Sequence, residues 1–122
     1  HFAGAFPLWL APVQIAVLPV SEKFNDYAAG VAKRLRDAGV RVDLDDSSDK
    51  IGSKIRRATM AKVPYMAVVG QREAEADTVS VRHRTAGDSG SMSAEQLLAG
   101  LKKEIATKGA EPLVAEAVAS SQ

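Results

Sequence analysis

Cysteine is missing from this 122-residue sequence, and histidine occurs only twice, as His1 and His83. The absence of cysteine excludes a disulfide framework and a thiolate metal site, and it favours an intracellular protein. Two histidines are too few for a histidine-rich metal site. An excess of one charge sign is missing too, because the formal net charge is only +1, so charge alone favours no class of partner.

Extremes of composition are also absent. Hydrophobic residues make up 46% of the sequence and charged residues 25%, which is typical of a globular domain. A chain of 122 residues has the size of one domain and can bury a real core. The sequence begins with HFAG rather than with Met, so we expect a fragment of a longer chain or a processed product.

The longest apolar run, FPLWLAPVQIAVLPV at 6–20, does not fit a membrane helix or a signal peptide. A bilayer crossing needs about 20 apolar residues, and the three prolines in the run would interrupt such a helix. A signal peptide would have a basic start and a small-residue cleavage site, and neither is present. The run instead predicts an extended lead-in over 6–12 and a buried strand over 13–18, apolar on both faces.

The rest of the chain alternates between helical and strand patterns, which predicts an α/β domain with a partly parallel sheet. Gly39 is placed to end the first helix. The predicted elements are a helix at 22–38, a strand at 40–45, a helix at 50–62, strands at 63–70 and 78–84, a glycine-rich loop at 85–91, a helix over 94–105, and an Ala-rich tail or short helix at 108–122.

Catalytic chemistry has little support in the sequence. His83 has Asp88 and several serines nearby, but it continues the apolar face of Val79 and Val81, which favours packing over catalysis. The loop GDSGS at 87–91 lacks the spacing of a phosphate-binding loop, so a plain turn is the better interpretation. An independent small enzyme is therefore the weakest hypothesis.

The helix predicted at 50–62 has five basic residues and no acidic one. A solvated basic face would explain this, but ligands of open α/β sheets bind beyond the carboxyl ends of parallel strands, where this helix begins. Lysines and arginines with one carboxylate suit RNA, since cations hold phosphates and a carboxylate can accept hydrogen bonds from guanine. The candidate RNA-binding residues at or after the carboxyl ends of these strands are Lys50, Lys54, Glu73, Arg82 and Arg84.

Four segments carry a resemblance to a known family: HFAGAFPLWLAPVQ at 1–14, DKIGSKIR at 49–56, KVPYMAVVG at 62–70, and TVSVRHR with GDSGSMS at 78–93. On these segments the chain resembles the C-terminal anticodon-binding domain of threonyl-tRNA synthetase, a class II aminoacyl-tRNA synthetase. The resemblance implies a mixed five-stranded sheet flanked by three helices. It also implies a linker at 1–12, the anticodon-binding domain at 13–106 and a C-terminal tail at 107–122.

The resemblance further implies that the domain reads the second and third anticodon bases of tRNA(Thr), G and U. Glu73 and Arg82 match two of the family's base-contacting residues. At the third of these base-contacting residues, Ser48 stands where the family has Asn, and a serine hydroxyl cannot make the two-pronged contact of an amide. This departure motivates an alternative function, an accessory domain that binds RNA or a protein partner without anticodon selectivity.

The same resemblance sets expectations for partners, cofactors and location. The expected partner is the anticodon loop of tRNA(Thr), with neither DNA nor a membrane as a partner. The parent ligase is expected to form a homodimer and the fragment a monomer. No cofactor is expected in this chain, and ATP, Mg²⁺ and Zn²⁺ are expected in a catalytic domain upstream. The expected location is the cytoplasm or an organellar matrix.

Overall fold

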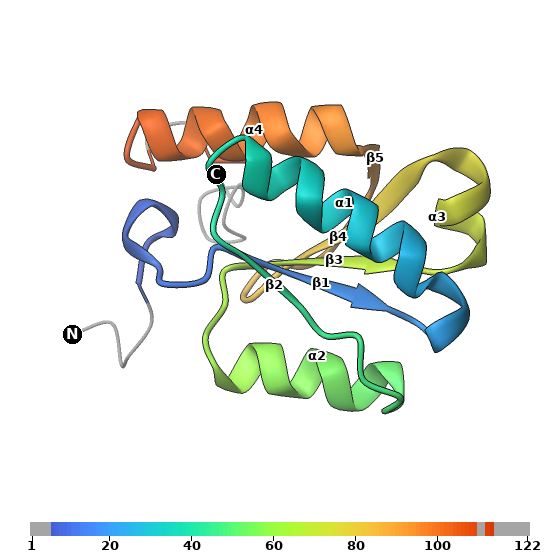
Figure 1. The fold of residues 1–122 in the computed structure, drawn as a ribbon. Helices are drawn as coiled ribbons and strands as arrows, with labels where there is room; N and C mark the ends of the chain where they lie inside the picture. Colours follow the sequence, from blue (N-terminus) through green and yellow to red (C-terminus); the bar gives the residue numbers. More distant parts are fainter. Residues whose placement is uncertain (1–5, 110–111, 114–122) are drawn as a thin grey trace.

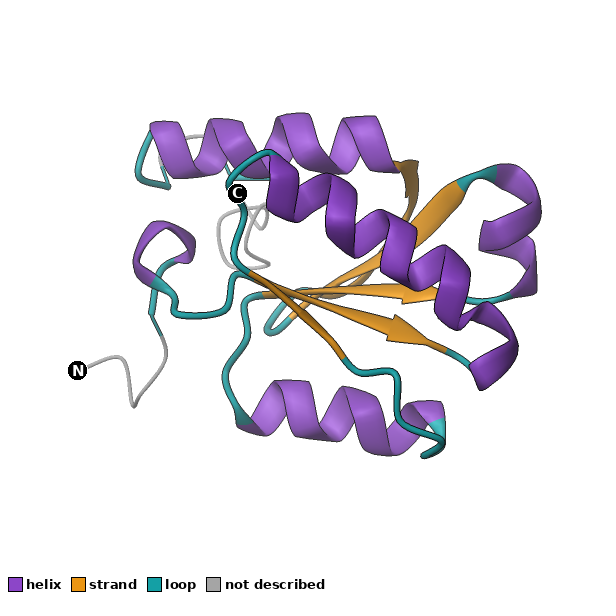
Figure 2. Ribbon diagram, in the orientation of Figure 1, coloured by secondary structure: helices purple, strands orange, loops and turns teal. Residues whose placement is uncertain are grey.

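The computed structural model describes residues 6–109 and 112–113, which form a five-stranded sheet between two helical layers (Figures 1 and 2). The elements in chain order are η1 (Leu8–Leu10), β1 (Ile15–Pro19), η2 (Glu22–Phe24), α1 (Asn25–Asp37), β2 (Val42–Leu44), α2 (Ile51–Met60), β3 (Tyr65–Val69), α3 (Gln71–Ala76), β4 (Thr78–His83), β5 (Gly87–Ser93) and α4 (Ala94–Ala106).

The sheet has the strand order β2-β1-β3-β4-β5. Strand β1 pairs in parallel with β2 and β3, whereas β3–β4 and β4–β5 are antiparallel pairs. The predicted mixed five-stranded sheet is therefore confirmed. Helices α1 and α4 cover one face, and α2 covers part of the other, as Figure 1 shows.

Two apolar clusters hold the layers together. The larger cluster joins the sheet to α1 and α4 and includes Ile15, Val17 and Leu97, all with no exposed surface. The smaller cluster joins Ala16 and Met66 of the sheet to α2. Strand β1 is buried at all five positions because helices cover both of its faces, as the apolar run predicted.

The structure corrects the prediction at two elements. Helix α3 is a fourth helix, beyond the three that the sequence predicted. The segment expected to be a glycine-rich loop forms β5 instead, pairing with β4 at the edge of the sheet. Gly87 and Gly90 have φ angles of +77° and +90°, so this edge strand contains backbone that glycine alone adopts readily.

The lead-in to β1 is folded against the domain and is not simply extended. Leu8 is 2% exposed and belongs to the larger cluster. The side-chain amide of Gln14 donates to the Leu8 carbonyl at 3.0 Å and accepts from the Arg41 backbone N–H at 2.9 Å. The segment from Leu8 onward thus belongs to the packed unit, whereas residues 1–5 and most of the predicted tail lie outside the described residues.

No helix among residues 6–109 has both the length and the hydropathy that crossing a bilayer would require.

Candidate nucleic-acid interface

Glu73 lies in the first turn of α3, directly after the carboxyl end of β3. Its Oε1 accepts a hydrogen bond from the Gly70 backbone N–H and its Oε2 accepts one from the Ser80 hydroxyl, both at 2.8 Å. Burial by itself raises the pKa of Glu73, but these hydrogen bonds outweigh it and hold the pKa below its ordinary value. The carboxylate is therefore charged at neutral pH and fixed in orientation by two donors.

Arg82 lies two residues beyond Ser80 on β4, so the two side chains project from the same face of the sheet. This face also carries Met66, which pairs with Arg82 in register and packs in the cluster beneath α2. Because Ser80 holds Glu73, the carboxylate lies at one end of the row that Ser80 and Arg82 form. The structure thus brings the two predicted base-contacting residues to one surface.

The turn between β2 and α2 is held by Arg57. Its guanidinium donates to Asp45 at 2.7 Å and to Asp49 at 2.9 Å, and Nη2 also donates to the Ser47 hydroxyl at 3.2 Å. Burial raises the pKa of Asp45, but hydrogen bonds from Arg57 and Ser47 outweigh it and lower the pKa below the ordinary value. The sequence analysis did not identify Arg57 as a site residue, although it lies two turns along α2 from the predicted Lys50.

Ser48 and Lys50 are exposed residues of this same turn. The turn follows β2, and Gly70 follows β3, so both segments lie at the carboxyl edge of the parallel strands. Ser48 and Glu73 therefore lie at the same edge of the sheet, with the end of β1 between their two strands. This agrees with the edge that the sequence predicted for ligand binding.

Lys54 is placed differently from the expectation. It has no exposed surface, and its ammonium donates to the Pro19 carbonyl at 2.8 Å. A solvated basic face is therefore the wrong interpretation for Lys54, because this residue faces the sheet on the same side of the helix as Ile55 and Ala58. An RNA contact by Lys54 stays a prediction, and the ammonium would have to leave Pro19 to make it.

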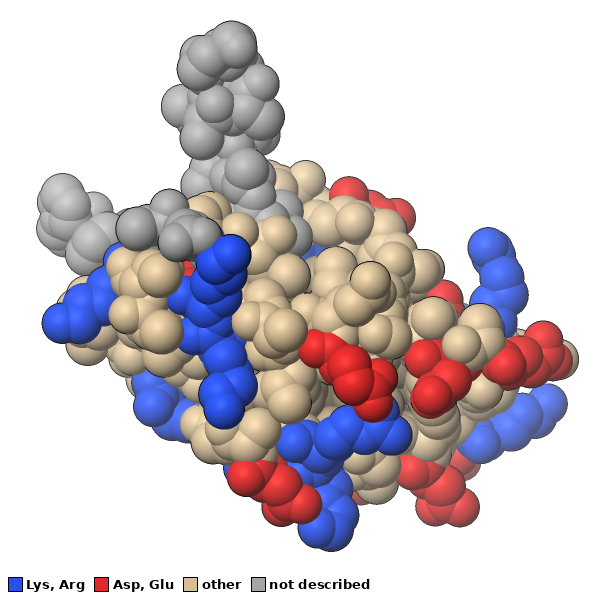
Figure 3. All heavy atoms as spheres, turned by 90° about the horizontal axis from the view of Figure 1, so that it is seen from above, with Lys and Arg blue, Asp and Glu red and all other residues tan. Residues whose placement is uncertain are grey.

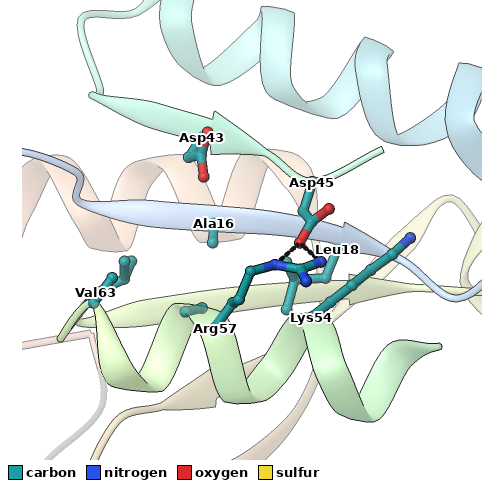
Figure 4. A pocket seen from close by; sticks show the side chains of 9 residues that line it. Ala16, Leu18, Asp43, Asp45, Lys54, Arg57 and Val63 are labelled. Carbon is teal, nitrogen blue, oxygen red and sulfur yellow. Dashed lines mark hydrogen bonds and ion pairs between the residues drawn. The ribbon is translucent and has the colours of Figure 1, made fainter. Parts of the chain in front are cut away.

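A cavity of about 200 Å³ lies between α2 and the strands β1 and β2, and both basic residues that line it, Lys54 and Arg57, already have hydrogen-bond partners. Figure 4 shows Arg57 reaching from α2 to Asp45 across this cavity, while Lys54 runs past Leu18 toward the end of β1. The cavity therefore offers no free cation to a ligand.

Arg84 follows β4, and its Nη1 donates to the Lys62 carbonyl at 3.3 Å.

His83, the histidine considered as a catalytic group, is 5% exposed and makes an edge contact with Tyr65 at 5.0 Å between ring centroids. Its Nδ1 accepts hydrogen bonds from the backbone N–H groups of Thr85 and Ala86. The predicted packing role of His83 is confirmed.

The opposite face of the molecule has no surface of a single charge sign. Figure 3 shows the face formed by α1 and α4, where basic and acidic side chains are interspersed. Two of its basic residues are in ion pairs, Lys33 with Asp37 and Arg34 with Glu95. Within the described ranges, no group of three metal-ligating side chains could hold an ion on either face.

Comparison with known proteins places this arrangement in a family. The family model described as "Anticodon binding domain" matches residues 14–104. Curated relatives include the threonine–tRNA ligases of Caldanaerobacter subterraneus subsp. tengcongensis, 55% identical over 108 residues, and of Clostridioides difficile, 50% identical over 108 residues. These alignments cover 88% of this chain and 17% of each relative, so the chain spans about one sixth of their length.

A solved structure has the same fold. The RNA binding domain of threonyl-tRNA synthetase from Cryptosporidium parvum Iowa II superposes with a TM-score of 0.81 at 31% sequence identity. The superposition covers 94% of this chain and 27% of that chain.

Proposed function

Because the chain belongs to the anticodon-binding domain family, in the form found in threonyl-tRNA synthetases, we propose that it binds the anticodon loop of tRNA(Thr) and reads its second and third bases, G and U. The observation that supports this proposal most is that Ser80, which holds the Glu73 carboxylate, shares one sheet face with Arg82 two residues further along β4. A carboxylate and a guanidinium are thereby presented on one surface.

Glu73 is suited to guanine because of its charge state. An ionised carboxylate has about four lone-pair sites, of which Gly70 and Ser80 each use one. The remaining sites can accept the adjacent N1–H and N2–H donors of guanine, while Arg82 can donate to base or phosphate oxygens. Where the family has the Asn of its third contact position, Ser48 offers a single hydroxyl to the anticodon.

A second proposal concerns the activity of the longer protein to which this chain would belong. We propose a threonine–tRNA ligase that binds ATP, Mg²⁺ and Zn²⁺ in a catalytic domain, forms a homodimer and acts in the cytoplasm or an organellar matrix. The present chain would supply tRNA positioning to that enzyme. Aminoacylation itself would be carried out by residues of the catalytic domain.

The acidic turn supports a second candidate function. Asp45 and Asp49 surround Ser48 and are only partly neutralised by Arg57, which disfavours a close approach of phosphate there. An accessory domain that binds RNA or protein without reading the anticodon would tolerate such a turn.

Binding of the chain to anticodon stem-loops separates these functions. The tRNA(Thr) stem-loop is compared with loops altered at the second or third base, at two salt concentrations. Selective binding supports anticodon reading, and Glu73→Ala or Arg82→Ala should then weaken binding to the unaltered loop by about 1–3 kcal/mol. Equal binding to all loops that falls steeply with salt would instead support the non-selective function.

A further inference from the structure

A second basic site lies at the far end of β4 from Glu73. A hollow of about 220 Å³ is lined there by Thr59, Lys62, Arg84 and Thr85. Thr59 is in the last turn of α2, Lys62 is in the connection from α2 to β3, and the other two residues follow β4. These segments meet because β4 runs antiparallel to β3, so the end of β4 lies beside the start of β3 (Figure 1).

The hollow carries two basic residues, of which Arg84 also lines a second pocket together with Glu104. None of its four lining residues is acidic, and the Arg84 guanidinium donates to a backbone carbonyl, that of Lys62. In the part of the chain that the structure describes, neither Lys62 nor Arg84 is in an ion pair. Arg57, in contrast, is held by two aspartates, so the hollow offers an anion more free positive charge than the turn at 45–50 does.

The backbone of Lys62 makes a clean test of its side chain possible. Lys62 has a φ of +61° and follows Ala61, the C-cap of α2, at the left-handed position of a helix stop that normally carries glycine. The hydrogen bonds of such a stop are present, from the Lys62 N–H to Thr59 and from the Val63 N–H to Ala58. A lysine therefore occupies a position where glycine would be less strained, so replacement by glycine removes the side chain without straining the backbone.

The hollow also continues the surface proposed to bind RNA. The Arg84 N–H donates to the Pro64 carbonyl at 3.0 Å, which extends the β3–β4 ladder one residue beyond β4. Because successive side chains of a strand point to opposite faces, Ser80, Arg82 and Arg84 lie on the same face of the sheet. Successive residues of this row are about 7 Å apart. A single RNA strand whose bases reach Glu73 can run along this row to the hollow.

We propose that the hollow binds a backbone phosphate of the anticodon arm, held by Lys62 and Arg84. This inference rests on the proposed function and extends it beyond the base-reading residues. Thr59 forms a wall of the hollow, because its hydroxyl already donates to the Ile55 carbonyl at 2.8 Å. The site contributes affinity to every sequence equally, since a phosphate carries no base identity.

The decisive variant is Lys62→Gly, tested in the whole 122-residue chain. Glycine relieves the left-handed backbone, so the melting temperature should rise. Affinity for the tRNA(Thr) stem-loop should nevertheless fall by about threefold, equally for loops altered at the anticodon, and the slope of log K against log salt should decrease by about 0.7–0.9. A merely structural role for Lys62 cannot give a more stable protein that binds RNA less well.

Lys108→Gly is the matched control. Lys108 has a φ of +52° and follows α4 in the same way, but it is not among the residues that line the hollow, and its ammonium lies over the Trp9 ring at 5.4 Å. This variant should leave RNA affinity unchanged. Arg84→Gln should lower the affinity for the stem-loop as Lys62→Gly does. A stem-loop with neutral methylphosphonate linkages should bind the wild-type chain and the Lys62→Gly chain with equal affinity.

The outcomes separate this proposal from the function on which it rests. If the wild-type chain binds the stem-loop and Lys62→Gly binds it with the same affinity and salt slope, the phosphate site is overturned and the proposed function stands. If Lys62→Gly changes base selectivity, the side chain contacts a base and the site is also overturned. If the wild-type chain binds no stem-loop, the proposed function fails and the phosphate site fails with it.

Discussion

The Ser80 hydroxyl donates a 2.8 Å hydrogen bond to Oε2 of Glu73 and thereby joins β4 to the first turn of α3. This bond determines the direction in which the carboxylate faces, because the other oxygen is held by the Gly70 N–H. Neither residue is fully buried, so the carboxylate is both oriented by the protein and accessible to a ligand.

Ser80→Ala should raise the pKa of Glu73 toward its ordinary value, because the side-chain donor that stabilises the charged form is lost. The titration of the Glu73 carboxyl carbon by NMR measures this shift. Stability should fall by no more than about 1 kcal/mol, since the pair is partly solvated. Ser91→Ala, at the position paired with Ser80 on β5, is the matched control and should leave the Glu73 titration unchanged.

The lowered pKa of Glu73 also predicts a pH dependence of stability. A carboxylate whose folded pKa lies below its ordinary value of 4.5 stabilises the fold above that value and loses this contribution as pH falls through the folded pKa. Between neutral pH and acid below pH 4.5, the wild-type chain should therefore lose more unfolding free energy than Glu73→Gln does. Urea titrations at a series of pH values measure the difference, and parallel curves for the two proteins would contradict it.

Gly70 has little space around its α-carbon. A Cβ there would lie 3.0 Å from Cγ2 of Val20 and 3.3 Å from Oε1 of Glu73. Gly70→Ala should therefore displace the Glu73 carboxylate, lower stability by about 1–3 kcal/mol and weaken binding of the stem-loop. Thermal unfolding and a binding titration measure the two effects.

Gly30→Ala is the control for that variant and should have the opposite sign. Gly30 lies within α1 and would have no atom within 4 Å of an added Cβ. Alanine there should stabilise the chain by about 0.5–1 kcal/mol, because glycine in a helix loses more conformational freedom on folding. Destabilisation by Gly30→Ala, or stabilisation by Gly70→Ala, would show that the space around these residues is not as described.

The strong patterns of the sequence predicted the main layers of the fold. The apolar run at 6–20 predicted β1, and Gly39, with a φ of +95°, follows α1 as expected. Helix α3 could not be found in this way, because it has six residues and none is buried, so it has no apolar period. Strand β5 lies at the sheet edge and is rich in glycine and serine, and such a segment is typical of a loop until its pairing with β4 is known.

The site was predicted less completely than the fold. Glu73 and Arg82 were identified through the resemblance, but Ser80, which orients the carboxylate, was not. The alternation of apolar and polar residues along β4 could have identified Ser80, because it places Ser80 and Arg82 on one face of the strand. Arg57 was missed because its two aspartate partners are distant by 8 and 12 residues in sequence and are brought to it only by the turn after β2.

Lys54 shows why charge in the sequence does not establish exposure. Its spacing from Ile51, Ile55 and Ala58 places it on the buried face of α2, and its ammonium reaches the Pro19 carbonyl at the end of β1. Lys54→Met keeps an unbranched chain of similar length but removes the donor, which leaves the Pro19 carbonyl without this partner. We therefore expect a loss of stability of about 1–3 kcal/mol, measured by urea unfolding.

Lys50→Met separates the structural role of Lys54 from a role in RNA binding. Lys50 is exposed at the start of α2, so its replacement should change stability by no more than about 0.5 kcal/mol while weakening RNA binding and its salt dependence. Lys54→Met should do the reverse, with lower stability and an unchanged salt slope for the folded protein. If Lys54→Met instead left stability unchanged and reduced the salt slope, the ammonium would exchange Pro19 for a phosphate when RNA binds, and the original prediction for Lys54 would hold.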